Sequence, residues 1–322
     1  MKRAYRVPDI GYNVLTAENL EQLHETTLEF LEQYGVCVYG EEAQEYFEGA
    51  GCEVDRETNM VRIPHNLVND CIDSAPGEYV MYPRGKGEEV LLRNGDPCYT
   101  NFGTGTMILD PYTGERRYST YQDVCDIARF IDAVDEVQVI TSPIVATDVT
   151  EDIKDLYEAK ALFCNTSKHV AHDTEGRENT RAVIRMAAAI AGGEEELRKR
   201  PILSLGCCPN SPLEIHREAG EQIIEAAKAG LPMDVLSMGL CGGTTPITLA
   251  GTLLTTNCEI LTGIVLTQII NKGNPVMYGS STTIMDMRRM TTPVGAPEHA
   301  MIGAAVAQIG SFYNIPAEAG GT

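Results

Sequence analysis

Histidine, cysteine and serine motifs are the first places in this sequence where catalysis or metal binding could occur. His169 and His172 form a close pair, with Asp173 directly after them. Metal sites use such ligands, but this run has the composition of a β-strand, in which positions three apart point to opposite faces. We therefore expect no metal site at this motif.

The ten cysteines do not have the spacing of a metal or redox framework. None of them forms a C-x-x-C pair, and only Cys207 and Cys208 are adjacent. Structural zinc sites and disulfide frameworks both show paired spacing. We expect free thiols in a reducing cytoplasm and no metal bound by this chain.

Two further residues, Ser280 and Lys168, have side chains that could act as nucleophiles, but their surroundings do not identify either one as a nucleophile. The segment Gly279–Thr282 contains Ser280 but lacks the second glycine of a nucleophile elbow, because Thr283 occupies that position. Lys168 is the lysine closest to a strand position suited to Schiff-base chemistry. These residues alone do not assign a reaction.

The elements that must position such residues form a repeated pattern from about residue 96 onward. Short apolar runs alternate with small-residue loops and helical segments at the roughly 30-residue spacing of a βα unit. Candidate strands begin near Tyr99, Gln138, His169, Ile202, Asp234, Val276 and Ile315. Parallel strands need such crossovers, and near-continuous apolar runs indicate a sheet covered on both faces.

Two parallel architectures compete for this pattern. A doubly wound sheet usually carries a glycine-rich ligand loop after its first strand, whereas Gly103-Thr104-Gly105 lacks the third glycine. A TIM-type (β/α)8 barrel places small and polar residues at the carboxyl ends of its strands, as here. We expect an α/β fold with a barrel over residues 96–322, incomplete because about seven strands are counted. Either one strand escapes the count, or the native chain continues past Thr322.

The first 95 residues have a different pattern, which predicts a small α/β segment over residues 1–95. Thr16 is suited to cap a helix that ends at Gly35. A second helix is expected at His65–Ser74, and short strands at Cys52–Asp55, Met60–Ile63 and Tyr79–Tyr82. This segment carries no recognisable chemistry.

The charge balance excludes some partners. The formal net charge of the 322 residues is −21, which repels phosphate backbones and anionic lipid, so we expect neither nucleic acid nor membrane as a partner.

The basic start, residues 1–8, leads into no apolar run, so no secretory signal is expected. The uncharged stretch from Val235 to Cys258 contains glycines, a proline and threonines, which favour a buried loop and helix over a membrane span. We expect a cytoplasmic protein.

A family resemblance extends over nearly the whole chain, with its motifs in order. They are Gly51–Asp55, Val61–Pro64, Asn101–Gly105, Cys164–His169, Cys208–Glu214, Val235–Met238, Leu249–Leu253, Met277–Thr283 and Pro293–Glu298. With these motifs the sequence resembles the trimethylamine:corrinoid methyltransferase (MttB) family. The resemblance implies barrels longer than this sequence. In the trimethylamine branch, a motif similar to Ala319-Gly320-Gly321-Thr322 is followed directly by pyrrolysine, which an in-frame amber codon encodes.

The resemblance implies a reaction as well as a fold. The methyl group of trimethylamine moves to the Co(I) of a corrinoid (cobalamin) that a cognate corrinoid protein carries, so this chain itself is expected to bind no cofactor. A neutral amine is a poor methyl donor, and an adduct with the pyrrolysine imine makes its nitrogen cationic. We read Thr322 as the last residue before an amber codon, expect the isolated chain to be inactive, and expect a homo-oligomer when full length.

Two other functions stay open. A glycine-betaine-type corrinoid methyltransferase acts on a quaternary amine that is already cationic, and a short binding or assembly subunit would have no catalysis. Glu214 and His216 depart from the D-x-H-x-x-G signature of cobalt-ligating corrinoid proteins, and we expect both on a solvated helix face.

The resemblance and the expected strand ends together give the candidate site. Tyr278 and Ser280 are the expected catalytic residues, and Phe102, Ser237 and Met238 the expected substrate-binding residues. Tyr278 and Phe102 could contact a methylammonium group by cation–π interaction, and Ser280 could hydrogen-bond the imine or adduct nitrogen. Packing at the barrel lip is the alternative role for each.

Overall fold

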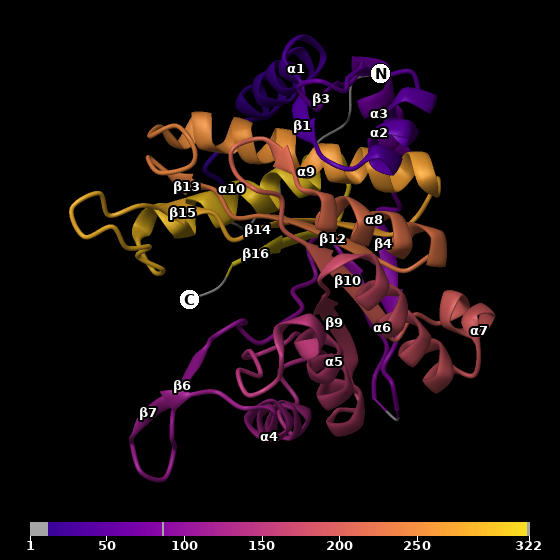
Figure 1. Ribbon diagram of the computed structural model, residues 1–322. Helices are drawn as coiled ribbons and strands as arrows, with labels where there is room; N and C mark the ends of the chain where they lie inside the picture. The colour runs from indigo at the N-terminus through magenta and orange to yellow at the C-terminus, as the bar shows by residue number, and fades with distance from the viewer. Residues whose placement is uncertain (1–11, 86, 321–322) are drawn as a thin grey trace.

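A computed structural model of the chain describes residues 12–85 and 87–320. The basic start at residues 1–8 and the expected amber position after Thr322 lie outside the described residues. In Figure 1 the N-terminal elements lie above the long helix α9, and a parallel sheet lies below it. The sheet is therefore covered on one side by helices that also carry the N-terminal segment.

The helices have the following bounds. They are α1 Ala17–Gln33, α2 Glu41–Gly49, α3 His65–Ser74, α4 Tyr121–Asp132, the 3-10 turn η1 Glu151–Ile153, α5 Lys154–Asn165, α6 Gly176–Ala191, α7 Glu194–Lys199, α8 Arg217–Ala229, α9 Leu249–Ile270 and α10 Pro297–Tyr313.

The strands fall into one large parallel sheet and several small ones. The parallel sheet contains β8 Val139–Ile140, β9 His169–Asp173, β10 Leu203–Cys207, β12 Met233–Ser237, β14 Val276–Ser280 and β16 Ala317–Ala319. The others are β1 Val36–Val38, β2 Glu53–Asp55, β3 Met60–Arg62, β4 Glu78–Met81, β5 Val90–Arg93, β6 Met107–Leu109, β7 Arg116–Tyr118, β11 Glu214–Ile215, β13 Leu240–Cys241 and β15 Thr283–Ile284.

The N-terminal elements confirm the expectations for their local sequence. Thr16 and Asn19 form a reciprocal capping box at the start of α1, which satisfies two backbone donors that the helix cannot pair internally. Gly35 has φ +81° and donates its N–H to Phe30 O, 3.0 Å away, because glycine adopts this left-handed conformation without a Cβ clash. The helix α3 has the expected bounds.

One strand of the N-terminal sheet comes from the second half of the chain. The sheet has the order β11-β1-β3-β2, and Glu214 and Ile215 in β11 pair in parallel with Cys37 and Val38 in β1. The prediction that Glu214 and His216 lie on a helix face is therefore wrong. The pairing with β1 holds this segment extended, and α8 begins only after His216.

The parallel sheet confirms a curled, incomplete TIM-type barrel. Its strands lie in the order β16-β14-β12-β10-β9-β8, so that each successive βα unit adds one neighbour in the same direction. That simple progression is the topology of a (β/α)8 barrel and differs from the strand-order reversal of a doubly wound sheet. The sheet of the described residues has six strands rather than about seven.

The seventh expected strand, near Tyr99, is an irregular extended segment. Thr100 forms only an isolated parallel bridge with Val139. Beyond it, the Asn101 side chain donates to Thr141 O (3.1 Å) and accepts from Thr141 N (3.0 Å). An amide side chain thus occupies the place of a backbone ladder, which is why the segment runs beside β8 without forming a regular strand.

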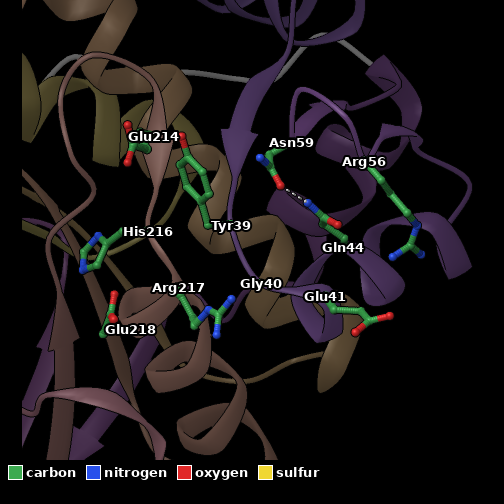
Figure 2. Close-up of a pocket in the computed structure, with 10 residues that line it drawn as sticks. All are labelled: Tyr39, Gly40, Glu41, Gln44, Arg56, Asn59, Glu214, His216, Arg217 and Glu218. Carbon is green, nitrogen blue, oxygen red and sulfur yellow. Dashed lines mark hydrogen bonds between the residues drawn. The ribbon is translucent and has the colours of Figure 1, made fainter.

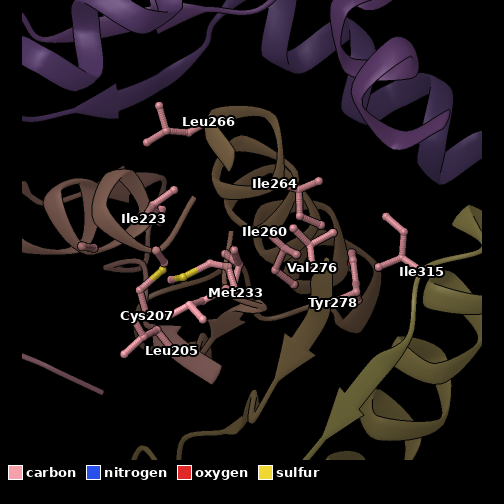
Figure 3. Packing of buried hydrophobic residues seen from close by; sticks show 14 of the residues in the cluster. Leu205, Cys207, Ile223, Met233, Ile260, Ile264, Leu266, Val276, Tyr278 and Ile315 are labelled. Atoms are coloured by element: carbon pink, nitrogen blue, oxygen red, sulfur yellow. The ribbon is translucent and has the colours of Figure 1, made fainter. Parts of the chain in front are cut away.

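The helix α9 is the centre of the hydrophobic core. It is long and apolar enough to cross a membrane by composition, but 83% of its most apolar window is buried inside the fold. A Cβ at Gly263 would lie 2.7 Å from Val235 Cγ1, so glycine lets α9 approach β12 closely. Figure 3 shows Ile260 and Ile264 of α9 beside Val276 and Tyr278 of β14. The expectation of a buried helix is confirmed.

The hairpin of β4 and β5 closes the amino-terminal end of the parallel sheet. Tyr82 N donates to Pro201 O, and the Tyr82 carbonyl lies 3.1 Å from His169 Nδ1 at the start of β9. Tyr79, Met81 and Leu92 from the hairpin pack with Val139 and Met277 in a second, smaller hydrophobic cluster. The opposite, carboxyl-terminal end of the sheet is left for the site.

Candidate active site

The side chains of each barrel strand alternate between a helix-facing side and a concave inner side. Val235 on β12 contacts α9 at Gly263, so the residues two apart from it share that helix-facing side. Ser237 Oγ donates to Glu259 Oε2 of α9 at 2.6 Å. The inner side of β12 therefore presents Asp234 and Leu236.

Tyr278 lies on the helix-facing side, which contradicts its expected contact with a ligand. Its ring is 1% exposed, its hydroxyl donates to Asn257 Oδ1 at 2.8 Å, and its ring centroid lies 6.0 Å from that of Tyr313. Burial raises its pKa well above the ordinary value. Tyr278 is a core residue that joins β14 to α9 and α10.

Ser237 and Ser280 are likewise turned away from the concave side. Ser237 is fully buried against Glu259. Ser280 Oγ donates to Thr282 Oγ1 at 2.9 Å and accepts from Thr282 N at 3.2 Å. Both hydroxyls are engaged in shaping the loops that follow β12 and β14, so neither is available to a ligand in this arrangement.

Phe102 and Met238 lie near the carboxyl ends of the strands and are open to solvent. Their side chains are 71% and 53% exposed, respectively. The Cys208 thiol donates to Met238 Sδ at 3.8 Å, which brings the loops after β10 and β12 together. Substrate contact by Phe102 and Met238 stays a prediction.

Lys168 is held far from a Schiff-base environment. Its Nζ donates to the carbonyls of Ile131, Val134 and Val137 at 2.7, 2.6 and 2.5 Å. It precedes β9, at the amino-terminal end of the sheet, and neutralises the carboxyl end of α4. Its role is structural.

Three acidic side chains lie on the concave side, and the sequence motifs did not reveal them. Asp173 ends β9, Asp234 lies in β12 and Glu318 lies in β16. Gly206 is paired with both Asp173 and Asp234, and Gly279 is paired with Glu318. We call these three acids, separated by two glycines, the carboxylate belt.

The two glycines give the carboxyl groups the space that they occupy. A Cβ at Gly206 would lie 2.5 Å from Asp173 Oδ1, and a Cβ at Gly279 would lie 2.5 Å from Asp234 Oδ1. With no side chain on β14 at this level, Asp234 on β12 and Glu318 on β16 face the same side of the sheet across Gly279. The belt therefore crosses five consecutive strands of the barrel.

Burial raises the pKa of all three acids, and the charges of neighbouring acids add to it for Asp234 and Glu318. Burial is the largest cause in each case, and the charge of Glu318 adds to it for Asp234, whose pKa lies well above its ordinary value. Asp173 keeps a solvent-exposed edge, so its side chain borders the open side of the concavity. Cations are favoured at such a place, because acidic groups gather there and none of them forms an ion pair with a basic side chain in the described part of the chain.

The groups around the belt are uncharged at neutral pH. Burial, followed by the charges of Asp173, Asp234 and Glu318, raises the pKa of the Cys208 thiol to about 12. Burial and Glu318 raise the pKa of Cys98 to about 11. The Tyr79 pKa is raised well above its ordinary value by burial and by Asp234. The site thus combines a carboxylate belt with neutral sulfur and aromatic walls.

No cluster of three or more potential metal ligands occurs within residues 12–85 and 87–320. A hollow of about 490 Å³ lies elsewhere, between the ends of β1 and β11 and the starts of α2 and α8. Figure 2 shows its lining, in which Glu214, His216, Arg217 and Glu218 lie on one side and Arg56 lies on the other. This hollow has mixed charge and is not at the barrel mouth, so we place the candidate site at the carboxylate belt.

Comparison with known proteins identifies the family and agrees with the fold. The model of the family described as "Trimethylamine methyltransferase (MTTB)" matches residues 3–322. The chain belongs to this family. Its members include Trimethylamine methyltransferase MttB of Desulfitobacterium hafniense, 47% identical over 311 residues, which are 97% of this chain and 63% of that protein.

Other members of the family are more distant. Trimethylamine methyltransferase MttB of Methanosarcina thermophila is 40% identical over 97% of this chain and 66% of its own length. Glycine betaine methyltransferase of Desulfitobacterium hafniense is 30% identical over 96% of this chain and 64% of its own length. The chain spans just under two thirds of the length of these relatives.

A solved structure of another protein is similar in fold to the present chain. The Methanosarcina barkeri monomethylamine methyltransferase aligns with a TM-score of 0.56 and 13% sequence identity, covering 93% of this chain and 65% of that one. At this identity the likeness concerns the fold alone. It supports the interpretation of the curled parallel sheet as part of a TIM-type barrel.

Proposed function

We propose that the carboxylate belt binds a methylated ammonium ion, and that the whole protein transfers a methyl group from trimethylamine to the cobalt of a corrinoid carried by a partner protein. The single observation that carries this proposal is that Asp173, Asp234 and Glu318 lie on the same concave side of a barrel of this family. The cobalt, when the partner supplies it, accepts the methyl group. The residues of this chain bind and orient the amine.

The geometry of the belt suits a cation with methyl groups. Asp173 lies at the exposed edge and offers a negative charge to an entering cation, while neutral Cys208 and Met238 border the same mouth. Methyl groups on a cationic nitrogen contact thioether and thiol groups without the loss of a hydrogen bond. Trimethylammonium therefore matches both the charge and the apolar wall.

The same belt disfavours a glycine betaine substrate. Betaine carries a carboxylate as well as a quaternary nitrogen, and the three acids repel the negative charge of that carboxylate. Glycine betaine methyltransferase is a 30% identical relative, so this alternative stays within the family. However, no basic side chain of the described residues forms an ion pair with the belt, so none is placed there to bind a carboxylate. We therefore propose the tertiary amine as the substrate.

A cytoplasmic location belongs to the same proposal. The ten cysteines are free, including Cys207 and Cys208 side by side. Six of them are buried, and free buried thiols are typical of a reducing compartment.

Titration calorimetry with trimethylammonium chloride tests the proposal on the chain itself. We expect Asp173→Asn to weaken binding about tenfold, the effect of roughly 1.4 kcal/mol of lost attraction. Asp135→Asn is the matched control, because Asp135 is exposed and lies after α4, away from the belt. The proposal fails if trimethylammonium does not bind, or if Asp173→Asn and the control bind it equally.

A further inference from the structure

His299, in the first turn of α10, has one ring nitrogen without a hydrogen-bond partner. The side chain is 5% exposed, and its Nδ1 lies 3.0 Å from the carbonyl oxygen of Thr282. Its Nε2 is buried as well, and no group of the described residues forms a hydrogen bond with it. A buried polar atom left without a partner costs free energy, so Nε2 marks a place where a ligand can supply a hydrogen bond.

The Thr282 carbonyl decides which kind of partner Nε2 needs. A carbonyl oxygen only accepts hydrogen bonds, so Nδ1 carries the hydrogen that is donated to it. In the neutral ring Nε2 then has a lone pair and no hydrogen. Thr282 is itself fixed at the barrel mouth, because its Oγ1 accepts from Ser280 Oγ at 2.9 Å and from Gly239 N at 3.1 Å. The loop after β14 therefore holds the ring with Nε2 as a hydrogen-bond acceptor.

Gly320 leaves a space beside the His299 ring. A Cβ at position 320 would lie 3.2 Å from His299 Cε1 and 3.1 Å from Ser281 Oγ, closer than the best separation of two carbon atoms. Because Cε1 is bonded to Nε2, the edge of the ring that borders this space is the edge next to the acceptor. Ser281 and Gly320 are both half-buried, so the space has an open side.

This space is on the concave side of the barrel, next to the carboxylate belt. The backbone ladder of β14 and β16 extends to Gly320, whose N–H donates to Ser280 O at 2.9 Å. Gly320 follows Glu318 by two residues, so the two positions face the same side, about 7 Å apart along the strand. Ser281 follows Gly279 by two residues in the same way, and a Cβ at Gly279 would point into the belt. The acceptor and the acids thus border the same part of the mouth.

We propose that His299 Nε2 accepts the N–H hydrogen of a tertiary ammonium ion bound at the carboxylate belt, and that this hydrogen bond makes the site select tertiary over quaternary ammonium ions. The inference rests on the proposed function, because it takes a methylated ammonium ion as the ligand of the belt. No covalent bond forms or breaks. The proton stays on the ammonium nitrogen, and His299 acts as a specificity-determining residue.

The selectivity follows from the donors that each ion carries. Trimethylammonium has a single N–H group, and a charged donor makes a stronger hydrogen bond than a neutral one. Tetramethylammonium has the same charge but a methyl group in place of that hydrogen, so it leaves a buried acceptor unpaired. Both ions share the attraction to the acids and the contacts of their methyl groups. Only the N–H group distinguishes them at His299.

Titration calorimetry with trimethylammonium chloride and tetramethylammonium chloride tests the selectivity. We expect the wild-type chain to bind trimethylammonium about tenfold more tightly than tetramethylammonium. In His299→Asn the amide N–H can replace Nδ1 in the bond to Thr282, but no atom replaces Nε2. This variant should bind the two ions within about twofold of each other. A wild-type preference that persists in His299→Asn overturns the role of His299.

Gly320→Ala tests the same space without altering the histidine. The new Cβ enters the space between Ser281 and His299, so the preference for trimethylammonium should fall at least threefold. Gly303→Ala is the matched control, because its Cβ would lie in ordinary contact, 3.6 Å from Ala319 Cβ. Gly303→Ala should keep the wild-type preference. Equal preferences in the two glycine variants contradict a ligand in this space.

Nitrogen-15 NMR of histidine-labelled wild-type chain reads the hydrogen bond directly. The Nε2 resonance of His299 should move upfield when trimethylammonium is added, as an acceptor nitrogen does on forming a hydrogen bond, and should not move in this way with tetramethylammonium. Equal binding of the two ions by the wild type, or the same Nε2 response to both, overturns the inference and leaves the proposed cation site intact. Absence of binding by either ion overturns the proposed function and the inference together.

Discussion

Ser237 Oγ at the end of β12 and Glu259 Oε2 in the middle of α9 are joined by a hydrogen bond of 2.6 Å. The same carboxyl group accepts from Ser211 Oγ at 2.9 Å and from Leu213 N at 2.8 Å. Glu259 is fully buried, and no ion pair to it is found in the described part of the chain. One buried acid thus ties two loops of the barrel mouth to the core helix.

Glu259→Ala is expected to destabilise the fold by about 3 kcal/mol, because two hydroxyls and one backbone N–H lose their acceptor in a buried place. Urea unfolding measures the change. Glu259→Gln keeps one acceptor oxygen and should lose less than half as much. Equal losses for the two variants would show that the three hydrogen bonds do not hold the loops.

The acids of the belt should lower stability as the pH rises. Their native pKa values are raised, so the native state binds more protons than the unfolded chain, and unfolding becomes easier as the pH rises through the native values. We expect Asp234→Asn to be more stable than wild type by about 1 kcal/mol at pH 8. The gain should shrink toward pH 4, where the wild-type acids are protonated. Urea unfolding at the two pH values checks this, and a gain that grows on acidification would contradict it.

His169 should act in the opposite direction. Burial lowers its pKa to about 4, although its ring nitrogens lie 3.1 Å from Tyr82 O and from Ser204 Oγ. The unfolded chain binds a proton near pH 6.5 and the native state does not, so this group contributes stability above pH 6.5 that is lost as the pH falls toward 4. Between pH 7.5 and 5 the loss is about 2 kcal/mol.

In urea unfolding, His169→Gln is expected to lack the loss of about 2 kcal/mol that protonation of His169 causes between pH 7.5 and pH 5. The comparison is between variant and wild type at pH 7.5 and pH 5, so that contributions from the belt cancel. An unchanged difference between the two pH values would mean that His169 is not buried in the neutral form.

Gly263→Ala tests the close contact between α9 and β12. The new Cβ would meet Val235 Cγ1 at 2.7 Å and Cγ2 at 2.9 Å, and such overpacking costs about 1–3 kcal/mol. The matched control is Gly49→Ala near the end of α2, where nothing lies within 4 Å of the new atom. Thermal unfolding should show a lower Tm only for Gly263→Ala. Similar Tm values for both variants would contradict the close approach.

The local sequence predicted the elements that depend on local rules. The capping pair at Thr16, the left-handed Gly35 and the helix His65–Ser74 all follow from side chains and backbone conformations within a few residues. The βα spacing and the family motifs likewise predicted the parallel barrel. The prediction of a regular strand near Tyr99 was wrong, because the Asn101 side chain makes the hydrogen bonds to Thr141 that a backbone ladder would otherwise make.

The candidate site was the harder prediction, because the barrel strands lack a clear polar alternation. Strand β14 is buried at all five positions, so its sequence does not show which side faces the concavity. Tyr278 and Ser280 were expected at the ligand and lie toward the helices instead. A usable signal existed in the single acids inside apolar strands, Asp234 and Glu318.

The sequence by itself determined the periodicity, the caps and the family of this protein, because these depend on residue types and their spacing along the chain. Only the tertiary structure decided which faces turn inward and which acids meet. Asp173, Asp234 and Glu318 lie on three strands and come together through register and curvature. Both are set by pairing between strands and by packing against α9, which no local stretch of the chain contains.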